Sequence, residues 1–399
     1  MLNKKNLIRT VILSFLFLVI SNVINEDNLI SDFRTFFGIT IIILLLILFF
    51  VRKDFLIKPT YIIGLFFFMI IYFLEFHLTL KDQRNYSSKP KGFVKQVCGS
   101  SFVNKENLNI YPLGGISFKK INFLNSENLA TNSSINDRYG FKNENSIWDL
   151  SSIDYIFLGD SFTWGADVES SDGFANLHAQ KYPKTLNLSC PGSGPLIQYG
   201  IFREYITKLK PRNVLWIYFS NDLRKDLPSE VKNYGNYLNK NFDQKLTKKQ
   251  NIIDDLIFKQ LNITTEENPQ SLLNQFFSFV KLTNLRGHLF SFSFKKESFI
   301  IYKKILENVN NEVQSWNGNL HVILIRHPKS FSNLISDNDE KSYYKYLINN
   351  LSEKINIIDF TSSIDSEDYK ELYSNRRGHF NIEGNQIFHE FLVKSVLNY

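Results

Sequence analysis

The stretch Tyr155-Ile-Phe-Leu-Gly-Asp-Ser-Phe-Thr-Trp-Gly165 decides the fold. Its four apolar residues, 155–158, predict a buried strand, and Gly159-Asp160 ends that strand. Ser161 would then stand on the turn at the carboxyl end of the strand, where open α/β sheets bind their ligands. Asp160 and Ser161 could equally cap the next helix, so this stretch alone does not choose between a capping role and a chemical one.

Outward from this stretch, the chain alternates short apolar runs with longer amphipathic segments. Further strands are expected at 185–188, 213–219, 321–325 and 355–360. Helices are expected at about 172–181, 197–208 and 299–316, and from Glu383 onward. This alternation predicts a parallel sheet with helices on both faces. The polar segment at about 227–296 interrupts the pattern, and we expect a helical insertion there that covers the cleft, binds a partner or lies on the surface.

Three apolar stretches near the N-terminus, at about 7–24, 36–51 and 60–80, predict three transmembrane helices, because each approaches the ~20 residues needed to cross a bilayer. Basic side chains precede the first stretch and separate the second from the third, whereas the loop between the first two is acidic. This charge pattern predicts a cytoplasmic N-terminus and an extracytoplasmic location for everything after Leu80. The chain divides accordingly into a membrane anchor (1–82), an extracytoplasmic linker or edge segment (83–150) and an α/β domain (151–399).

Composition narrows the classes of function. The 399 residues carry a net charge of +7, but the basic side chains are spread along the chain, without a Lys/Arg block interleaved with aromatic residues. We therefore expect no nucleic-acid partner. The seven histidines show no metal-binding spacing, so neither a metal nor another cofactor is expected. Cys98 and Cys190 could form one disulfide outside the cytoplasm or remain two buried thiols.

Four short blocks carry polar groups that suit acyl transfer. Ser161 is a candidate nucleophile, and Gly192, on the loop after the second predicted strand, could offer a backbone N–H to an oxyanion. Asn221 follows the next predicted strand and offers a neutral amide N–H for the same purpose. His379 stands on a loop before the last helix and could act as the base. Each block alone could be a turn, a cap or a surface residue, whereas their common position at the mouth of a parallel sheet indicates an active site.

This ordered set of Ser, Gly, Asn and His resembles the SGNH/GDSL hydrolase superfamily over roughly residues 154–399. The extended form Gly159-Asp-Ser-Phe-Thr-Trp-Gly165, with Asn221-Asp222, looks like the bacterial membrane-anchored branch of that superfamily. The resemblance implies a flavodoxin-like three-layer α/β/α sandwich. It also implies that Ser161 is the nucleophile and His379 the base, with an oxyanion hole formed by the Ser161 N–H, the Gly192 N–H and the Asn221 side chain.

The third member of the expected triad departs from that pattern. The superfamily usually carries an Asp two or three residues before the histidine, where this chain has Arg377 and Arg376. A Ser–His dyad could use a backbone carbonyl instead. An acid from elsewhere could also substitute, with Asp359 and Glu371 as first candidates and Asp365 as another, or the chain could have lost hydrolytic rate. The two arginines could bind an anionic substrate such as an acidic glycan, or simply face water.

The sequence therefore predicts a membrane-anchored serine esterase that hydrolyses acyl esters, acetyl esters foremost, on an envelope glycan. It would lie in the bacterial inner membrane with its catalytic domain in the periplasm. Its partners would be the acylated glycan or another ester substrate, and the membrane lipid. Two alternatives stay open: an O-acyltransferase that uses the same Ser–His site with a membrane-bound partner, and a non-catalytic protein for the assembly or binding of envelope polysaccharide.

Overall fold

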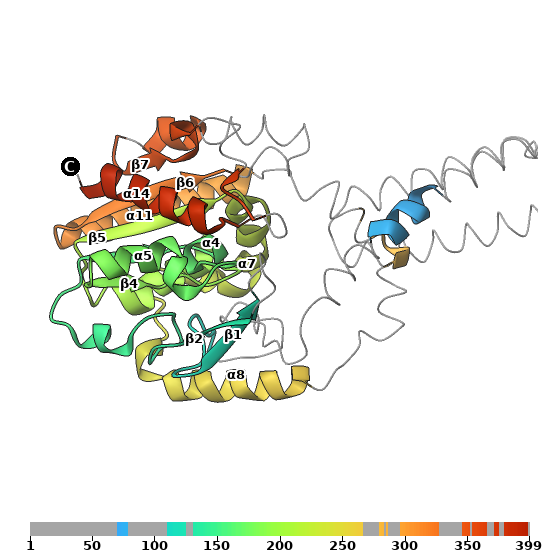
Figure 1. Cartoon of the computed structure of the whole chain (residues 1–399), viewed down its shortest axis with the longest axis horizontal. Coiled ribbons are helices and arrows are strands. Elements are labelled where there is room, and N and C mark those ends of the chain that lie inside the picture. Colours follow the sequence, from blue (N-terminus) through green and yellow to red (C-terminus); the bar gives the residue numbers. More distant parts are fainter. Residues whose placement is uncertain are drawn as a thin grey trace, which may run out of the picture. The chain divides into compact units, whose positions relative to one another are not determined.

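The computed structural model describes most of the α/β domain and short segments elsewhere (Figure 1). The described residues are 70–78, 110–124, 131–265, 279–282, 285, 296–326, 345–351, 353–364, 371–374 and 379–397. The chain forms two compact units, Met1–Lys89 with Glu267–Phe292 and Pro90–Glu266 with Ser293–Tyr399. The candidate site lies wholly within the second unit.

Five parallel strands form the central sheet of the second unit, in the order β4-β3-β5-β6-β7. Their bounds are β3 Tyr155–Leu158, β4 Thr185–Asn187, β5 Asn213–Phe219, β6 Asn319–Ile325 and β7 Asn356–Asp359. Numbered along the chain, this is the flavodoxin-like order 2-1-3-4-5, in which ligands bind where the strand order reverses, here between β3 and β5. The five predicted strands and their parallel arrangement are confirmed.

The helices of the second unit also lie close to their predicted positions. Their bounds are α4 Ser161–Trp164, α5 Phe174–Lys181, α6 Pro195–Ile201, α7 Leu227–Tyr234, α8 Gln250–Thr265, α11 Lys296–Ser315 and α14 Ile382–Leu397. Two π-helical turns, η4 Phe202–Ile206 and η5 Asp222–Asp226, extend α6 and precede α7. Short 3-10 helices complete the unit: η2 Asn145–Asp149, η3 Ser170–Asp172, η6 Gly235–Leu238, η7 Leu246–Lys248 and η9 Thr361–Ser363.

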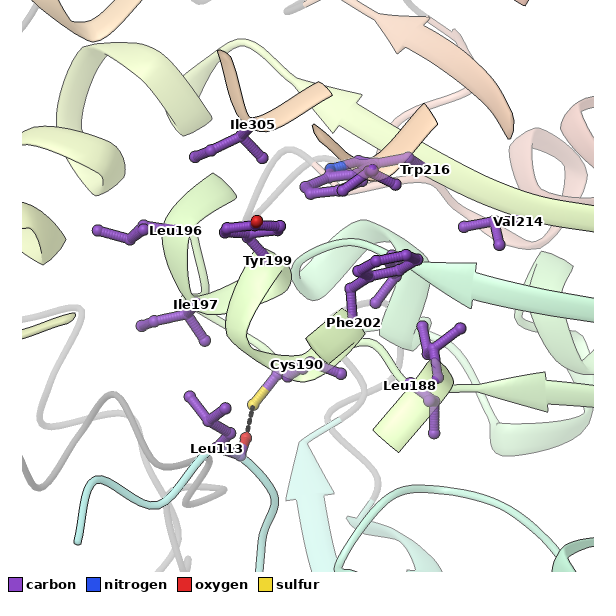
Figure 2. Close-up of a cluster of buried hydrophobic side chains, with 14 of the residues drawn as sticks. Leu113, Leu188, Cys190, Leu196, Ile197, Tyr199, Phe202, Val214, Trp216 and Ile305 are labelled. Carbon is purple, nitrogen blue, oxygen red and sulfur yellow. Dashed lines mark hydrogen bonds between the residues drawn. The ribbon is translucent and has the colours of Figure 1, made fainter. Parts of the chain in front are cut away.

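Helices cover both faces of the sheet. Successive side chains of a strand point to opposite faces, and β5 accordingly contributes Val214, Trp216 and Tyr218 to one buried cluster and Leu215, Ile217 and Phe219 to another. Residues of α6 and α11 complete the first cluster, and residues of α5 and α14 complete the second. Figure 2 shows part of the first cluster, including Tyr199, Trp216 and Ile305. The domain is therefore an α/β/α sandwich, as expected.

The described part of the segment expected as a linker or edge belongs to the core instead. Ile110, Leu113, Ile116 and Phe141 are buried in the first cluster. Strands β1 Lys120–Leu124 and β2 Thr131–Ile135 form a separate antiparallel pair. The segment was not predicted to enter the core because its few apolar residues are widely spaced and show neither a helical nor a strand period.

The helical insertion lies in two different places. Helix α7 packs against α6 and against the loop after β4, through contacts described below. Helix α8 instead packs on the segment before β1, where Ser117 donates from N (2.9 Å) and from Oγ (2.5 Å) to the Asp254 carboxylate. Of the described insertion, therefore, only α7 lies at the candidate site.

The first unit is described over short segments only. Residues 70–78 are helical; Tyr72 donates to the Val280 carbonyl (3.0 Å), and the buried Glu75 accepts from the Leu285 N–H (2.6 Å). Two of the three predicted transmembrane stretches, and most of the third, lie outside the described residues. Within the described residues, no helix combines the length and apolar character needed to cross a membrane.

Cys190 follows β4 and is fully buried and disulfide-bonded. Cys98, the other cysteine of the chain, lies outside the described residues. The Cys190 sulfur contacts the Leu113 carbonyl at 3.6 Å (Figure 2). Of the two states left open by the sequence, the structure has Cys190 in a disulfide.

Candidate active site

Ser161 and His379 meet at the carboxyl end of the sheet. Ser161 is the first residue of α4, directly after β3, and its Oγ lies 2.8 Å from His379 Nε2. Asp160 caps α4 by accepting from the Phe162 N–H at 2.9 Å. The capping role and the chemical role considered for this stretch therefore belong to neighbouring residues. Asp160 caps the helix, and Ser161 presents its hydroxyl to the imidazole.

Backbone pairing and an aromatic contact hold the histidine loop in place. Tyr373 and Phe380 form an isolated antiparallel bridge, and the Ser374 N–H donates to the His379 carbonyl at 2.8 Å. The Phe162 ring lies 4.9 Å from the imidazole, measured between centroids. The His379 side chain is 19% exposed, so one edge of the site remains open to substrate.

Asp167 supplies the carboxylate that orients the imidazole. Its Oδ2 lies 3.0 Å from His379 Nδ1 and accepts a second hydrogen bond from Ser374 Oγ at 3.0 Å. The Asp167 side chain is fully buried, and its backbone is left-handed, with φ 76°. With the Nδ1 proton facing this carboxylate, His379 Nε2 is left to accept the proton of Ser161, as in serine triads.

The acids expected from the sequence do not occupy that position. Asp359 forms an ion pair with Arg326 (2.5 Å) and accepts from the Thr361 N–H. Glu371 is exposed, and its backbone carbonyl accepts from the Asn381 side chain. The expectation that Asp359 or Glu371 orients His379 is corrected to Asp167. The other candidate acid and the two arginines before the histidine lie outside the described residues; they are Asp365, Arg376 and Arg377.

Asp167 escaped the sequence analysis because it precedes the histidine by 212 positions. The usual position of the acid directs attention to residues close to the histidine, and Asp167 lies instead six positions after Ser161. One feature of the sequence could have pointed to Asp167. Gly165 is the kind of residue that ends a helix in a left-handed turn, as it does for α4, and Asp167 follows it by two positions.

The three expected oxyanion donors come from adjoining loops. β3 pairs with both β4 and β5, so the loops that carry Ser161, Gly192 and Asn221 leave the same edge of the sheet side by side. Gly192 has φ +77°, a conformation that favours glycine, and a side chain there would meet nothing within 4 Å. Its backbone is therefore open to an incoming group. The Asn221 amide donates to Asp226 at 2.6 Å, and its side chain also hydrogen-bonds the Asp160 carboxyl.

Helix α7 supports two of these loops from behind. Glu230 accepts from the N–H groups of Gly194, of Leu196 (2.9 Å) and of Ile197 (3.3 Å), which caps the start of α6. A Cβ on Gly194 would lie 2.5 Å from the Asp226 Cβ, so only glycine fits against α7 there. Asp226 and Glu230 thus fix Asn221 and the loop after Gly192. Sequence analysis missed Glu230 because the insertion resembled a polar surface segment, and it missed Asp226 because that residue directly precedes the insertion without a motif of its own.

Burial shifts the carboxyl groups behind the site toward their protonated forms. It raises the pKa of Asp160, raises the pKa of Asp222 well above its usual value with help from the charges of Asp160 and Asp226, and raises the pKa of Glu230 to about 7. These carboxyl groups therefore bind a proton at higher pH than exposed carboxyl groups do.

Lys142 braces the turn between Ser161 and Asp167. Its Nζ donates to the Trp164 carbonyl at 3.2 Å and lies 4.2 Å from the centroid of the Trp164 ring. Burial lowers the pKa of Lys142 to about 7, although the carbonyl and the ring both favour the charged form. Within the described residues, no group of three or more His, Cys, Asp or Glu side chains is arranged to hold a metal ion.

No protein-family model and no curated protein matches the chain. Several solved structures do match. TesA matches at 10% identity, and the alignment covers 61% of this chain and 97% of TesA with a TM-score of 0.36. A putative lipolytic protein of the G-D-S-L family from Desulfitobacterium hafniense DCB-2 matches at 12% identity, with 61% and 100% covered and a TM-score of 0.37. The acetyl xylan esterase AlAXEase matches at 14%, with 61% and 100% covered and a TM-score of 0.35. Scores of this size carry no argument about function.

The strand order, the four sequence blocks and the Ser161–His379 contact agree with the resemblance to the SGNH/GDSL hydrolase superfamily seen in the sequence. The place of the acid departs from the pattern of that superfamily. Asp167 comes from the loop after the nucleophile, whereas the pattern of the superfamily places the acid just before the histidine.

Proposed function

We propose that the chain is a serine ester hydrolase whose triad is Ser161, His379 and Asp167. The observation that carries this proposal is the continuous chain of contacts from Ser161 Oγ through both imidazole nitrogens to Asp167 Oδ2, at 2.8 and 3.0 Å. Both distances are within hydrogen-bond reach, the geometric requirement for a nucleophile and its base.

In the first half of the reaction, His379 Nε2 takes the Ser161 proton as Oγ attacks the ester carbonyl. The Ser161 N–H, the Gly192 N–H and the Asn221 amide donate to the resulting oxyanion. Asp167 stabilises the imidazolium and keeps its tautomer. The intermediate collapses when His379 gives its proton to the leaving alcohol, which leaves an acyl ester on Ser161.

In the second half, water attacks that acyl ester while His379 again removes the proton. A second tetrahedral intermediate forms in the same oxyanion hole and releases the carboxylic acid, and the proton returns to Ser161 Oγ. Atoms balance as one ester and one water giving one alcohol and one acid. An alcohol that replaced the water would make the same site an acyltransferase, so the assay below includes an acceptor.

The proposed substrate is an acyl ester, acetyl foremost, on a glycan of the bacterial envelope, and the proposed location is the periplasmic face of the inner membrane. Two observations support the location: the three apolar N-terminal stretches with their flanking charges, and the disulfide-bonded Cys190, since disulfides persist in oxidising compartments. The binding-only alternative was motivated by the missing acid, and Asp167 removes that motive.

The test uses the full-length chain with p-nitrophenyl acetate and a fluorophosphonate probe, with and without an added sugar alcohol as acceptor. Ser161→Ala is expected to lose both turnover and labelling. Ser315→Ala, at the exposed end of α11, is the matched control and is expected to keep both. Full turnover by Ser161→Ala would rule out the proposed nucleophile, and acetyl transfer to the sugar in preference to water would replace the hydrolase with the transferase.

A reporter fused after Tyr399 tests the location separately. A reporter that is active only in the periplasm is expected to work at this position. Activity of a cytoplasm-specific reporter there would reverse the proposed orientation.

A further inference from the structure

The triad acid and the triad histidine come from distant parts of the chain. Asp167 lies on the loop after α4 and His379 on the loop before α14, 212 positions apart. An acid two or three positions before the histidine would be held beside the imidazole by the chain itself. In this protein, a contact between the two loops has to provide that restraint.

Ser374 contacts both members of the pair. Its backbone N–H donates to the His379 carbonyl at 2.8 Å, and its Oγ donates to Asp167 Oδ2 at 3.0 Å. This carboxylate oxygen is the one that faces His379 Nδ1, also at 3.0 Å. A single residue therefore joins the histidine loop to the acid.

The contact between Ser374 and Asp167 is shielded from water. Ser374 is only 3% exposed, and the Asp167 side chain is fully buried. A carboxylate that leaves water is destabilised unless donors face it, and an O–H that donates to a charged oxygen forms one of the stronger hydrogen bonds in proteins. The Ser374 hydroxyl is thus one of the donors that keep Asp167 ionised.

The backbone around Ser374 is held by contacts that do not involve its hydroxyl. Tyr373 and Phe380 form an antiparallel bridge, and the Asn381 N–H donates to the Leu372 carbonyl at 2.9 Å. Removal of the Ser374 hydroxyl should therefore leave the two segments paired and change only the restraint on the acid.

We propose that Ser374 is a positioning residue of the triad, whose hydroxyl holds Asp167 Oδ2 on His379 Nδ1 and keeps that carboxylate ionised. Its effect on rate rests on the proposed function. Without the hydroxyl, the carboxylate holds a proton more tightly, either its own or the one it shares with the imidazole. In both cases His379 accepts from Ser161 only at higher pH, so the acidic limb of the pH–rate profile moves to higher pH.

Titratable groups from neighbouring elements also face the triad. Asp160, which follows β3, interacts electrostatically with His379. Lys142 contacts the Trp164 carbonyl and ring on the turn that leads to Asp167. Both groups are retained in every variant described below, so a difference between the acidic limbs of two variants comes from the substitution itself.

The test uses variants of the full-length chain. Ser374→Ala removes the hydroxyl, and Ser374→Thr and Ser374→Val form a matched pair, since Thr and Val have nearly the same shape and differ in the hydroxyl. Asn385→Ala is the control for a loosened loop. Asn385 accepts from the Phe174 N–H at 3.0 Å and donates to the Asn381 carbonyl at 2.8 Å, so its loss weakens the histidine loop while the Ser374 hydroxyl stays in place.

The first readout is the hydrolysis of p-nitrophenyl acetate from about pH 5 to about pH 9. We expect Ser374→Ala and Ser374→Val to lower kcat by about tenfold and to move the acidic limb upward by at least about 0.5 pH unit. Ser374→Thr should keep the native limb, and Asn385→Ala should lower kcat or the thermal midpoint without moving it. An unmoved limb in Ser374→Ala, or an equal shift in Asn385→Ala, would overturn the proposal.

The second readout does not depend on turnover. An imidazole Nδ1–H that donates to a buried carboxylate gives a proton NMR signal far downfield, and His379→Gln identifies this signal by removing it. We expect the signal to move in Ser374→Ala and Ser374→Val and to keep its position in Ser374→Thr. If the native chain hydrolyses no ester, the proposed function fails, and the signal still decides the role of Ser374. An identical signal in the native chain and in Ser374→Ala would show that Ser374 does not position the acid.

Discussion

Replacement of Asp167 by Asn tests the triad at its least expected member. In the native protein, Asp167 Oδ2 faces His379 Nδ1 at 3.0 Å inside a fully buried environment. If the new amide turns its NH₂ toward Nδ1, the proton must move to Nε2, which can then no longer accept from Ser161. If the amide turns its oxygen to Nδ1 instead, the tautomer survives, but a neutral group replaces the charge that stabilises imidazolium.

We expect both orientations of the Asn amide to lower kcat by a similar factor. Loss of the orienting acid lowers turnover by about 10⁴ in serine triads, which corresponds to about 5.5 kcal/mol of transition-state stabilisation. The backbone should tolerate the change, because Asn adopts left-handed backbone conformations more readily than most residues, and the position has φ 76°. We therefore expect kcat to fall while the unfolding midpoint changes little.

The assay is steady-state hydrolysis of p-nitrophenyl acetate, with thermal unfolding measured on the same samples. Asp359→Asn is the matched control, since it removes the acid expected from the sequence together with its ion pair to Arg326. Its rate should stay within about threefold of the native one. The reasoning is refuted if Asp167→Asn keeps its rate within about tenfold, or if Asp359→Asn loses as much as Asp167→Asn was expected to lose.

Three further outcomes follow from the site. Ser161→Ala should lower kcat by about 10⁶, as removal of a triad nucleophile does, measured with the same ester; a loss below about a hundredfold would exclude Ser161 as the nucleophile. If Asp226 acts by holding Asn221, the double variant Asn221→Ala/Asp226→Ala should have the same kcat as Asn221→Ala alone. A double-mutant cycle measures this, and additive losses of kcat would show that Asp226 has an independent role. The pKa of Lys142 is about 7 in the folded protein and near its usual 10.5 in the unfolded chain, so the unfolded state binds more protons between those two pH values. The urea midpoint of the native protein should therefore rise from pH 7 to pH 10 relative to Lys142→Met, and parallel curves would show that Lys142 does not titrate there.

The sheet could be predicted because each strand carries its own local signal. The strand Asn213–Phe219 is apolar from Val214 onward, and all seven residues are buried, since helices cover both faces of β5. Ser161 and His379 could be paired from topology alone, because parallel strands bring their carboxyl ends to one edge. The predicted hydrogen bond between them is present at 2.8 Å.

Contacts between distant segments could not be predicted in the same way. The pairing of Asp167 with His379 depends on a left-handed turn and on a loop far along the chain, and no periodicity records it. The roles of Asp226 and Glu230 depend on how α7 docks against Gly194, which a polar, helix-rich segment does not reveal. The local sequence pattern thus predicts the helices and strands, whereas the conformations of the loops between them decide which acidic side chains lie at the site.

The separation of the acid from the histidine changes how chains of this kind should be recognised in genomes. A pattern search that requires an acid two or three positions before the histidine would classify this chain as a pseudoenzyme. Gly-Asp-Ser followed six positions after the Ser by Asp, as in 159–167, retrieves the nucleophile and the acid from a single short window. Once the acid is supplied there, the positions before the histidine no longer need to carry one, and selection can fill them with other residues, here two arginines.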